Sequence, residues 1–204
     1  HVSIGLLNSS ENSIYENTLF SNDLAGIYIG HSQNNLVFKN SVFSNLIGLF
    51  IQDLPQLYCD DRECWYGPEY PPSQNNSIFE NKIFNNSQSG ICVESWNNSN
   101  IARNRIFRNE IFENGIYGIH IQSTNASALE SNFIYENNIS NNTEWGIFIE
   151  NCSNNSIFNN SIVENRKGVS IYPDSDYNKI EKNFICRNHI YDVDLNSSLK
   201  FLNN

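Results

Sequence analysis

Residues 155–171 read NSIFNNSIVENRKGVSI, and this stretch decides the fold. It places Asn at three positions five residues apart, Asn155, Asn160 and Asn165, and an aliphatic residue stands two positions after each of the first two. Three residues after the last Asn, Gly168 opens a short apolar strand. The same arrangement occurs seven times, beginning at Asn12-Ser13-Ile14, Asn35-Leu36-Val37, Asn76-Ser77-Ile78, Asn104-Arg105-Ile106, Asn132-Phe133-Ile134, Asn155-Ser156-Ile157 and Asn178-Lys179-Ile180.

The Asn content of the chain is explained by this repeat. The 204 residues include 37 Asn, although Asn is disfavoured in ordinary helices and strands. Successive first Asn residues are 23, 41, 28, 28, 23 and 23 positions apart, so the length varies in one connection, after the Gly strand. Variation at a single point is typical of a solenoid with loops on one edge. Helix pairs fit poorly, because Ile, Phe, Val and Asn are weak helix formers.

The pattern therefore predicts an all-β chain that folds as a parallel β-helix, a solenoid of about seven coils with three short strands in each. Parallel crossovers are almost always right-handed, which predicts a right-handed solenoid. Aliphatic residues should point inward, and the Asn residues should stack at the corners and bond to one another. We expect one such structural ladder at Asn17, Asn40, Asn81, Asn109, Asn137, Asn160 and Asn183.

Two further features of the repeat lead to predictions. The last repeat replaces the Gly by Asp192, which we interpret as a residue that tolerates the positive φ often supplied by Gly. Aromatic residues follow the aliphatic ones and should form stripes on the outside of the solenoid. These rings either stack on one another along the ladder or bind a partner, such as sugar rings or another protein. They stand at Tyr15, Phe38, Phe79, Phe107, Tyr135 and Phe158, and at Phe20, Phe43, Phe84 and Phe112.

The pattern N-x-I-x-x-N-x-I-x-x-N…G-I-x-I resembles the parallel β-helix repeats of the family that includes the pectin-active enzymes and the NosD-like periplasmic and surface proteins. The resemblance covers residues 12–195 almost continuously. It implies the fold strongly and an activity weakly, because the repeat is architectural. The clustered Asp, Gly-His-Gly and Arg-x-Lys signatures of the β-helix pectinases are absent from this sequence.

The chain is expected to form one domain over residues 1–204, with a loop insertion at 54–74. Residues 3–6 fit the Gly strand of a preceding coil, and residues 199–204 fit the first strand of a following one. No cap is visible at either end, although solenoid ends are normally covered. This predicts uncapped ends, either of a fragment or of copies stacked end to end into a filament.

The insertion holds four of the five Pro residues and a cluster of aromatic and acidic side chains. Cys59 and Cys64 lie close enough in sequence to form a disulfide there, whereas the pairing of Cys92, Cys152 and Cys186 stays open. Such a segment suits sugar stacking or a Ca²⁺ site, the one cofactor that we consider, or it is a spacer between subunits. The ligand-binding candidates are Tyr58, Asp60, Asp61, Trp65 and Tyr66.

The sequence also indicates glycosylation. Eleven Asn outside the corner columns begin an N-x-[ST] triplet, more than chance predicts, and this favours a secreted chain, extracellular or at a cell surface, with covalent glycans. A turn-rich composition without modification is the alternative. The acceptors are Asn8, Asn75, Asn85, Asn97, Asn125, Asn138, Asn141, Asn151, Asn154, Asn159 and Asn196.

Composition and spacing exclude several functions. The net charge of −10 argues against nucleic acid, whose phosphates demand Lys and Arg, and no apolar run has the ~18 residues of a membrane span. The four His residues occupy unrelated repeat positions, which speaks against the copper site that the NosD resemblance suggests and predicts no metal site. Asp174 and Asp176 are weak candidates for paired catalytic carboxylates, in a stretch that otherwise reads as a turn.

From these observations we expect a non-catalytic structural subunit of a cell-surface layer, matrix or filament, whose partners are copies of itself, stacked end to end or side by side. The alternative is a β-helix protein that binds or cleaves a polysaccharide, as a lyase, hydrolase or epimerase. The exposed aromatic residues and the acidic insertion favour this second hypothesis.

Overall fold

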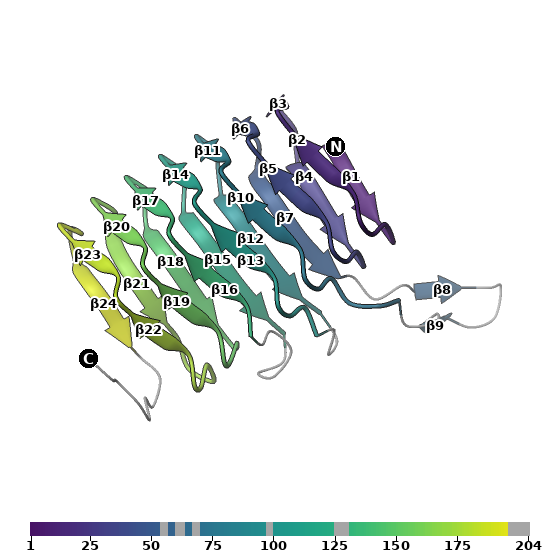
Figure 1. The fold of residues 1–204 in the computed structure, drawn as a ribbon. Coiled ribbons are helices and arrows are strands. Elements are labelled where there is room, and N and C mark those ends of the chain that lie inside the picture. The colour runs from purple at the N-terminus through teal and green to yellow at the C-terminus, as the bar shows by residue number, and fades with distance from the viewer. Residues whose placement is uncertain (54–56, 60–63, 67–69, 97–99, 125–130, 196–204) are drawn as a thin grey trace.

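The chain folds as a parallel β-helix, as the repeat predicts (Figure 1). The computed structural model describes residues 1–204 except 54–56, 60–63, 67–69, 97–99, 125–130 and 196–204, and of residues 57–59 and 64–66 it describes the backbone alone. The described elements are all strands. Three parallel sheets run along the rod, and a two-stranded antiparallel hairpin projects from it.

The longest strands form sheet A, in the order β1 (Val2–Leu7), β4 (Ala25–Gly30), β7 (Ile47–Asp53), β12 (Ser89–Ser95), β15 (Tyr117–Ser123), β18 (Trp145–Glu150), β21 (Lys167–Ile171) and β24 (Tyr191–Leu195). Sheet B contains β2 (Ser13–Tyr15), β5 (Leu36–Phe38), β10 (Ser77–Phe79), β13 (Arg105–Phe107), β16 (Phe133–Tyr135), β19 (Ser156–Phe158) and β22 (Lys179–Glu181). Sheet C contains β3 (Thr18–Phe20), β6 (Ser41–Phe43), β11 (Lys82–Phe84), β14 (Glu110–Phe112), β17 (Asn138–Ser140), β20 (Ser161–Val163) and β23 (Phe184–Cys186). The hairpin is β8 (Leu57–Cys59) with β9 (Cys64–Tyr66).

Each coil passes through sheet B, then sheet C, then sheet A, and equivalent residues of the repeat pair in register. Ile78, for example, lies between Val37 and Ile106 in sheet B. Residues 3–6 belong to β1 and pair with β4, which confirms their assignment to the Gly strand of a preceding coil. The hairpin lies in the connection that follows β7, where the repeat predicts the longest insertion. Residues 199–204 lie outside the described residues.

One aliphatic core runs the length of the rod. Each B and C strand contributes its middle residue, such as Ile106 and Ile111, and each complete A strand contributes two, such as Ile119 and Ile121. These four side chains are fully buried. Each buried Ile contributes about 1.5–3 kcal/mol, so stacked aliphatic residues are the main source of stability.

Three Asn ladders line the corners, as predicted. Within a ladder, the backbone N–H and the Nδ2 of one Asn both donate to the Oδ1 of the Asn in the next coil; for Asn81 and Asn109 both distances are 3.0 Å. The same Nδ2 also donates to a backbone carbonyl, as Asn109 does to Ile78 at 2.9 Å. Side chains that are almost fully buried are therefore satisfied from coil to coil.

The residue before each ladder Asn adopts a left-handed conformation. All 21 of these positions have φ between 52° and 62°, and none is Gly. They include residues that rarely adopt this conformation, such as Lys39 and Glu113. The hydrogen bonds of the following Asn hold each turn in this strained conformation. The turn therefore forms without a Gly at the left-handed position.

The interpretation of Asp192 as a residue with positive φ is wrong, because the Gly positions that it replaces do not have positive φ. Those Gly residues are required by close packing: a Cβ on Gly168 would lie 2.2 Å from the carbonyl oxygen of Asp192. The Asp192 carboxylate instead accepts the backbone N–H and the Nδ2 of Asn188, at 3.2 and 2.7 Å. It thus takes the part that an Asn plays elsewhere in the ladder.

Candidate active site

The outer face of sheet A carries the chemistry that the repeat does not require. In β15, Ile119 and Ile121 point into the core, so His120 between them points outward. The parallel register places His120 beside Cys92 on one side and Phe148 on the other. Tyr117 opens the same strand and lies beside Trp145. Residues that are distant in sequence are thereby brought onto one surface.

The imidazole of His120 is held between aromatic rings and a carboxylate. The ring centroids of His120 and Tyr117 lie 4.2 Å apart in a stacked arrangement, and Phe148 lies 5.4 Å away on a tilt. Nε2 of His120 lies 3.3 Å from Oε1 of Glu150. The His120 side chain is 8% exposed and that of Glu150 is 35% exposed. A carboxylate that orients a histidine is the arrangement of a general acid–base pair.

A second carboxylate lies on the same face, in a row that runs across the coils. Glu94 accepts a hydrogen bond from Gln52 Nε2 at 2.7 Å and another from Gln122 Nε2 at 2.5 Å. In register, Gln122 lies between Glu94 and Glu150. Because both of its oxygens already accept amide hydrogen bonds, we assign Glu94 to the fixed polar groups of this face and not to the reacting ones.

The phenol and the thiol nearest to His120 both hold their protons. Burial, with Glu150 as the next cause, raises the pKa of Tyr117, so its hydroxyl remains a proton donor at neutral pH. Burial, and then Glu94, raises the pKa of the Cys92 thiol. A buried thiol of raised pKa is unreactive, so Cys92 serves in packing.

Further aromatic side chains extend the face from His120 toward the C-terminal coils. Trp145 stacks on Tyr117 at 5.1 Å, and Tyr172 meets Phe148 edge-on at 4.9 Å. Nζ of Lys167 lies 4.1 Å from the centroid of Trp145. Partly exposed aromatic residues beside fixed polar groups are typical of carbohydrate-binding surfaces.

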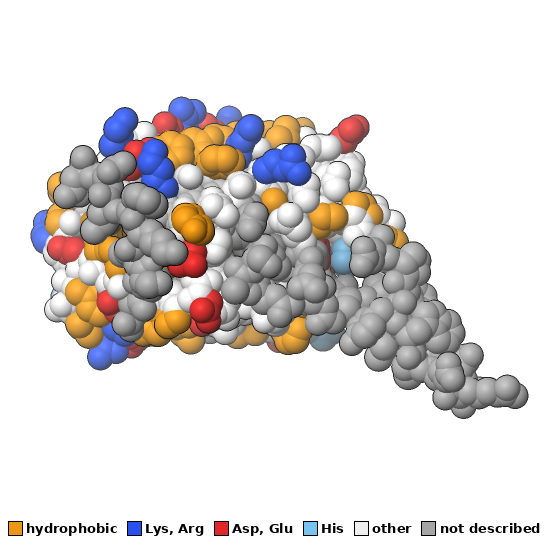
Figure 2. All heavy atoms as spheres, turned by 90° about the horizontal axis from the view of Figure 1, so that it is seen from below, with side chains coloured by type: hydrophobic (Ala, Val, Ile, Leu, Met, Phe, Trp, Pro, Cys, Tyr) orange, Lys and Arg blue, Asp and Glu red, His pale blue; other side chains and the backbone are white. Residues whose placement is uncertain are grey.

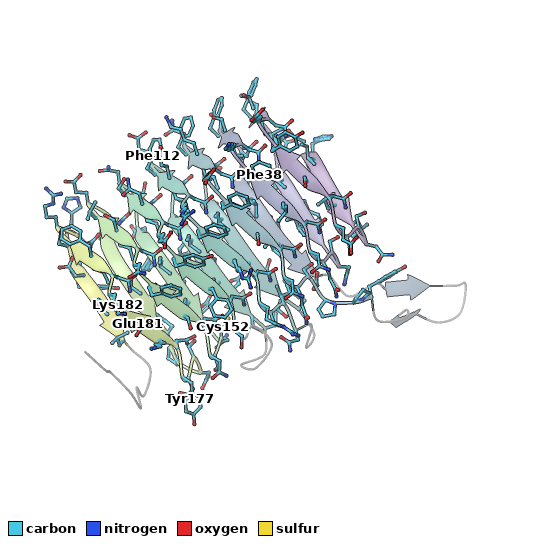
Figure 3. The ribbon with its side chains drawn as sticks, viewed as in Figure 1. Phe38, Phe112, Cys152, Tyr177, Glu181 and Lys182 are labelled. Carbon is cyan, nitrogen blue, oxygen red and sulfur yellow. The ribbon has the colours of Figure 1, made fainter. Side chains whose placement is uncertain are left out.

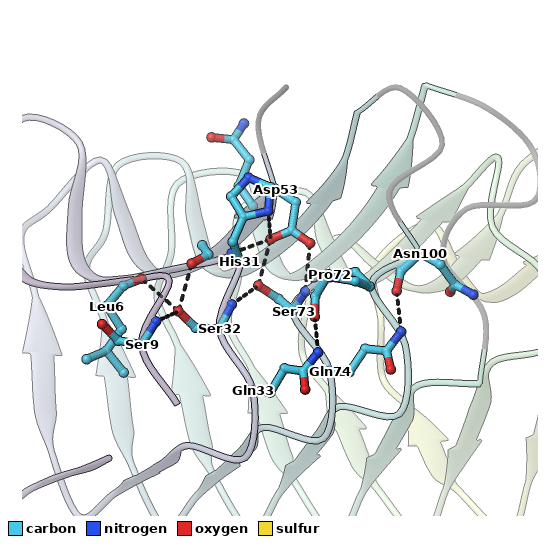
Figure 4. A network of polar contacts seen from close by, with 12 residues as sticks. Leu6, Ser9, His31, Ser32, Gln33, Asp53, Pro72, Ser73, Gln74 and Asn100 are labelled. Atoms are coloured by element: carbon cyan, nitrogen blue, oxygen red, sulfur yellow. Dashed lines mark hydrogen bonds and ion pairs between the residues drawn. The ribbon is translucent and has the colours of Figure 1, made fainter. Parts of the chain in front are cut away.

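A polar network fixes the chain where the insertion begins and ends (Figure 4). Asp53, the last residue of β7, is 1% exposed. Its carboxylate accepts the backbone N–H of His31 at 2.7 Å, the backbone N–H of Ser73 at 2.7 Å and the Ser73 hydroxyl at 2.6 Å. These bonds join three successive coils at the base of the hairpin. We assign the network a structural part.

The candidates within the insertion fall mostly outside the described side chains. Asp60 and Asp61 lie outside the described residues, and only the backbone is described for Tyr58, Trp65 and Tyr66. Cys59 and Cys64 occupy directly opposite positions of the hairpin, a register in which a disulfide would join neighbouring strands. Sugar binding, Ca²⁺ binding and the disulfide therefore stay predictions.

Asp174 and Asp176 lie in the turn after β21, where Asp174 is exposed with φ 60° and the Asp176 backbone bonds to residues 153 and 154. Their assignment as catalytic carboxylates stays a prediction. Among the described residues, no three His, Cys, Asp or Glu side chains cluster in a way that would hold a metal ion. Cys92, Cys152 and Cys186 are free thiols.

The structure accounts for much of the excess of N-x-[ST] triplets. Seven of the eight acceptors within the described residues have positive φ, a conformation that Asn tolerates better than most residues: Asn8, Asn75, Asn85, Asn141, Asn151, Asn154 and Asn159. The eighth, Asn138, lies in β17; Asn97, Asn125 and Asn196 lie outside the described residues. In five of these turns the triplet consists of the left-handed Asn, the ladder Asn and the Ser or Thr after it. Glycosylation stays a prediction with a weaker basis.

The outer aromatic residues of sheets B and C stack on one another. Phe38 and Phe79, for example, have centroids 5.0 Å apart and planes within 7°, and Phe84 and Phe112 lie 5.1 Å apart (Figure 3). The faces of an interior ring are covered by its neighbours, so the stacks present edges to the surface and lack the open faces that sugar stacking needs. Hydrophobic side chains accordingly reach the surface of the rod in patches among polar ones (Figure 2).

Sequence reasoning missed His120, Glu150 and Tyr117 as a site. His120 was considered only as one of four scattered His residues. The sequence does contain a signal for this site. It is the residue between the two inward aliphatic positions of each Gly strand. This residue is aromatic in several coils, as at Tyr28, Phe50 and Phe148, but it is Cys92 and His120 in two others.

The comparisons with known proteins agree with this fold. The family model described as "Right handed beta helix region" matches residues 1–134 and 103–204, and the chain belongs to that family. A comparison with curated proteins gave no match. In the part of the chain that the structure describes, no helix is long and apolar enough to cross a membrane.

Two of the similar solved structures are epimerases. The periplasmic alginate epimerase AlgG is 22% identical, with a TM-score of 0.68 over 88% of this chain and 36% of that one. The A-module of the Azotobacter vinelandii mannuronan C-5 epimerase AlgE6 is 12% identical, with a TM-score of 0.64 over 99% of this chain and 59% of that one. The chain thus spans about a third of the length of AlgG and under two thirds of the AlgE6 module.

These comparisons correct one expectation. The hypothesis of a non-catalytic structural subunit is contradicted, because the similar structures are of enzymes that modify polysaccharides. The alternative hypothesis, a carbohydrate-active β-helix protein, agrees better with them.

Proposed function

We propose that the protein is a polysaccharide-modifying enzyme, an epimerase or lyase that moves a proton at C5 of a uronate residue, with its site on the outer face of sheet A. The observation that carries the proposal is the His120–Glu150 pair, stacked against a phenol that keeps its proton. The similar structures named above are epimerases of uronate polymers, and this supports a polyuronate as the substrate of this chain.

In the proposed reaction, His120 donates its Nε2–H to Glu150 and removes the C5 proton with Nδ1. Glu150 acts as a positioning residue that orients the imidazole and stabilises its protonated form. A proton that water returns to the opposite face of C5 inverts the centre and completes an epimerisation. Alternatively the bond from C4 to the glycosidic oxygen breaks, a double bond forms between C4 and C5, and Tyr117, on the same side as His120, gives its proton to the departing oxygen. Hydrolysis is less well supported, because both oxygens of Glu94 already accept amide hydrogen bonds.

The same comparison supports a proposal about the setting. We infer that the chain works outside the cytoplasm, in a periplasmic or extracellular space where polysaccharides are found. N-linked glycans at exposed corners, such as Asn75 and Asn159, would be compatible with this setting, because these residues are exposed and lie outside the strands of sheet A.

His120→Ala should abolish the proposed activity. General acid–base catalysis contributes about 10²–10⁴-fold, so we expect the rate to fall by at least about 100-fold in a protein that is still folded, although loss of the buried ring should lower its melting temperature. The measurement is proton NMR of the C5 configuration, together with the ultraviolet absorbance of unsaturated ends, after incubation with a panel of polyuronates. The matched control is His189→Ala, an exposed His after β23 that should retain the full rate. A His120→Ala variant as active as the wild type would refute the site.

A further inference from the structure

The strands of sheet A are acidic. Their sequences contain five carboxylates, Asp53, Glu94, Glu150, Asp192 and Asp194, and only one Lys or Arg, which is Lys167. Lys167 is already engaged, with Nζ 3.9 Å from Oε2 of Glu144 and 4.1 Å from the centroid of Trp145. The whole chain carries a net charge of −10.

Two of these carboxylates, Glu94 and Glu150, lie close to His120, and the partners described for them are neither Lys nor Arg. In register, Glu94 and Glu150 are one coil to either side of Gln122, which is two residues after His120 in β15. Glu94 is bonded to two neutral amides, and Glu150 is bonded to the imidazole itself. Burial raises the pKa of Tyr28 and Tyr117, and nearby carboxylates, Glu94 for Tyr28 and Glu150 for Tyr117, raise it further.

This electrostatic setting conflicts with a substrate whose carboxyl groups are ionised. Removal of the C5 proton from a uronate anion places a second negative charge on the same group, and a fixed cation would be needed to stabilise it. The described residues of sheet A offer no uncommitted cation at His120. An ester needs less stabilisation, because its enolate carries a single charge and its C5 proton is more acidic.

We propose that the substrate is a polyuronate whose carboxyl groups are esterified, so that the reacting sugar is uncharged. This inference rests on the proposed function of the same site. The C5 proton passes to Nδ1 of His120, and the electron pair of the C5–H bond moves into the ester carbonyl as an enolate. The pair then returns to C5, which takes a proton from water on its opposite face, or it forms the C4–C5 double bond as the glycosidic oxygen leaves with the Tyr117 proton. Neither path consumes an oxidant, a reductant or another co-reactant.

The test uses one polymer in two states: a methyl-esterified polyuronate and the same preparation after saponification. Wild-type protein and His120→Ala are incubated with each at low ionic strength, and the C5 configuration and unsaturated ends are measured. We expect kcat/KM to be at least tenfold higher for the ester, with no turnover of either polymer by the variant beyond that of an enzyme-free control.

The outcomes separate this inference from the proposed function. Turnover of the saponified polymer at an equal or higher rate, dependent on His120, would refute the esterified substrate and leave the proposed function in place. No turnover of either polymer would overturn both. The salt dependence of the rate is an independent test. Added salt should raise the slow rate on the saponified polymer, because it screens the repulsion between the anionic polymer and the acidic face of sheet A. A rate that falls with salt would indicate that the protein attracts the anionic polymer, and it would contradict the inference.

Discussion

Gly118→Ala should lower the free energy of unfolding by about 3 kcal/mol. The added Cβ would lie 2.6 Å from the carbonyl oxygen of Gly146, 2.7 Å from Cγ2 of Ile139 and 2.9 Å from Nδ2 of Asn142. Two of these neighbours belong to the next coil's backbone and core, and the third to its Asn ladder. None of them can move without disturbing the stack, so the strain of one methyl group should spread to the neighbouring coils.

The control for this prediction is Gly5→Ala. Gly5 also lies in a strand of sheet A, and a Cβ there would meet nothing within 4 Å. We expect this variant to unfold at the same denaturant concentration as the wild type. Equal stability of the Gly118→Ala and Gly5→Ala variants in equilibrium denaturation would show that the coils are not packed as closely as the structure indicates.

Asn109→Ala should cost about 3 kcal/mol. The side chain is 1% exposed, and its Oδ1 accepts both the backbone N–H and the Nδ2 of Asn81. Truncation leaves these two buried donors without their acceptor, and each unsatisfied donor costs about 1–3 kcal/mol. It also removes the Asn109 Nδ2 bonds to Ile78 and Asn137.

Asn138→Ala is the matched control for this ladder variant, because Asn138 is an exposed Asn beside the ladder residue of the next coil. Chemical denaturation of the two variants should give a large loss for the first and a loss within about 0.5 kcal/mol for the second. A loss of the same size in both would mean that the ladder does not contribute more than a surface Asn.

The architecture could be predicted from the sequence because the fold requires a side-chain amide at the same position of every repeat. Asn109 and its equivalents form the same hydrogen bonds at the same corner of every coil, so the pattern can be recognised in the sequence alone. The left-handed residue before each Asn could not be predicted, since Lys39, Glu113 and Ser131 share no side-chain property; the conformation is imposed by the bonds of the next residue.

The site was hidden for a different reason. His120, Cys92 and Glu150 are separated by 28 and 30 residues and become neighbours only when the register of sheet A is known. The outward column holds aromatic residues, a Cys and a His, so no single residue type repeats in it as Asn does at the corners. The surplus of N-x-[ST] triplets has two explanations, because the left-handed turns favour the same residues as a glycosylation signal, and glycosylation stays a prediction.

The central claim is that the outer face of sheet A is where the polysaccharide binds. Hydroxyl-radical footprinting by mass spectrometry, with and without a saturating uronate oligosaccharide in its ester form, tests it most directly. We predict that the oligosaccharide protects Tyr117, Trp145 and Tyr172 from oxidation and leaves Tyr15 and Phe20, at the exposed ends of the aromatic stacks, unchanged. Protection of Tyr15 and Phe20 with none at Trp145 would contradict the account.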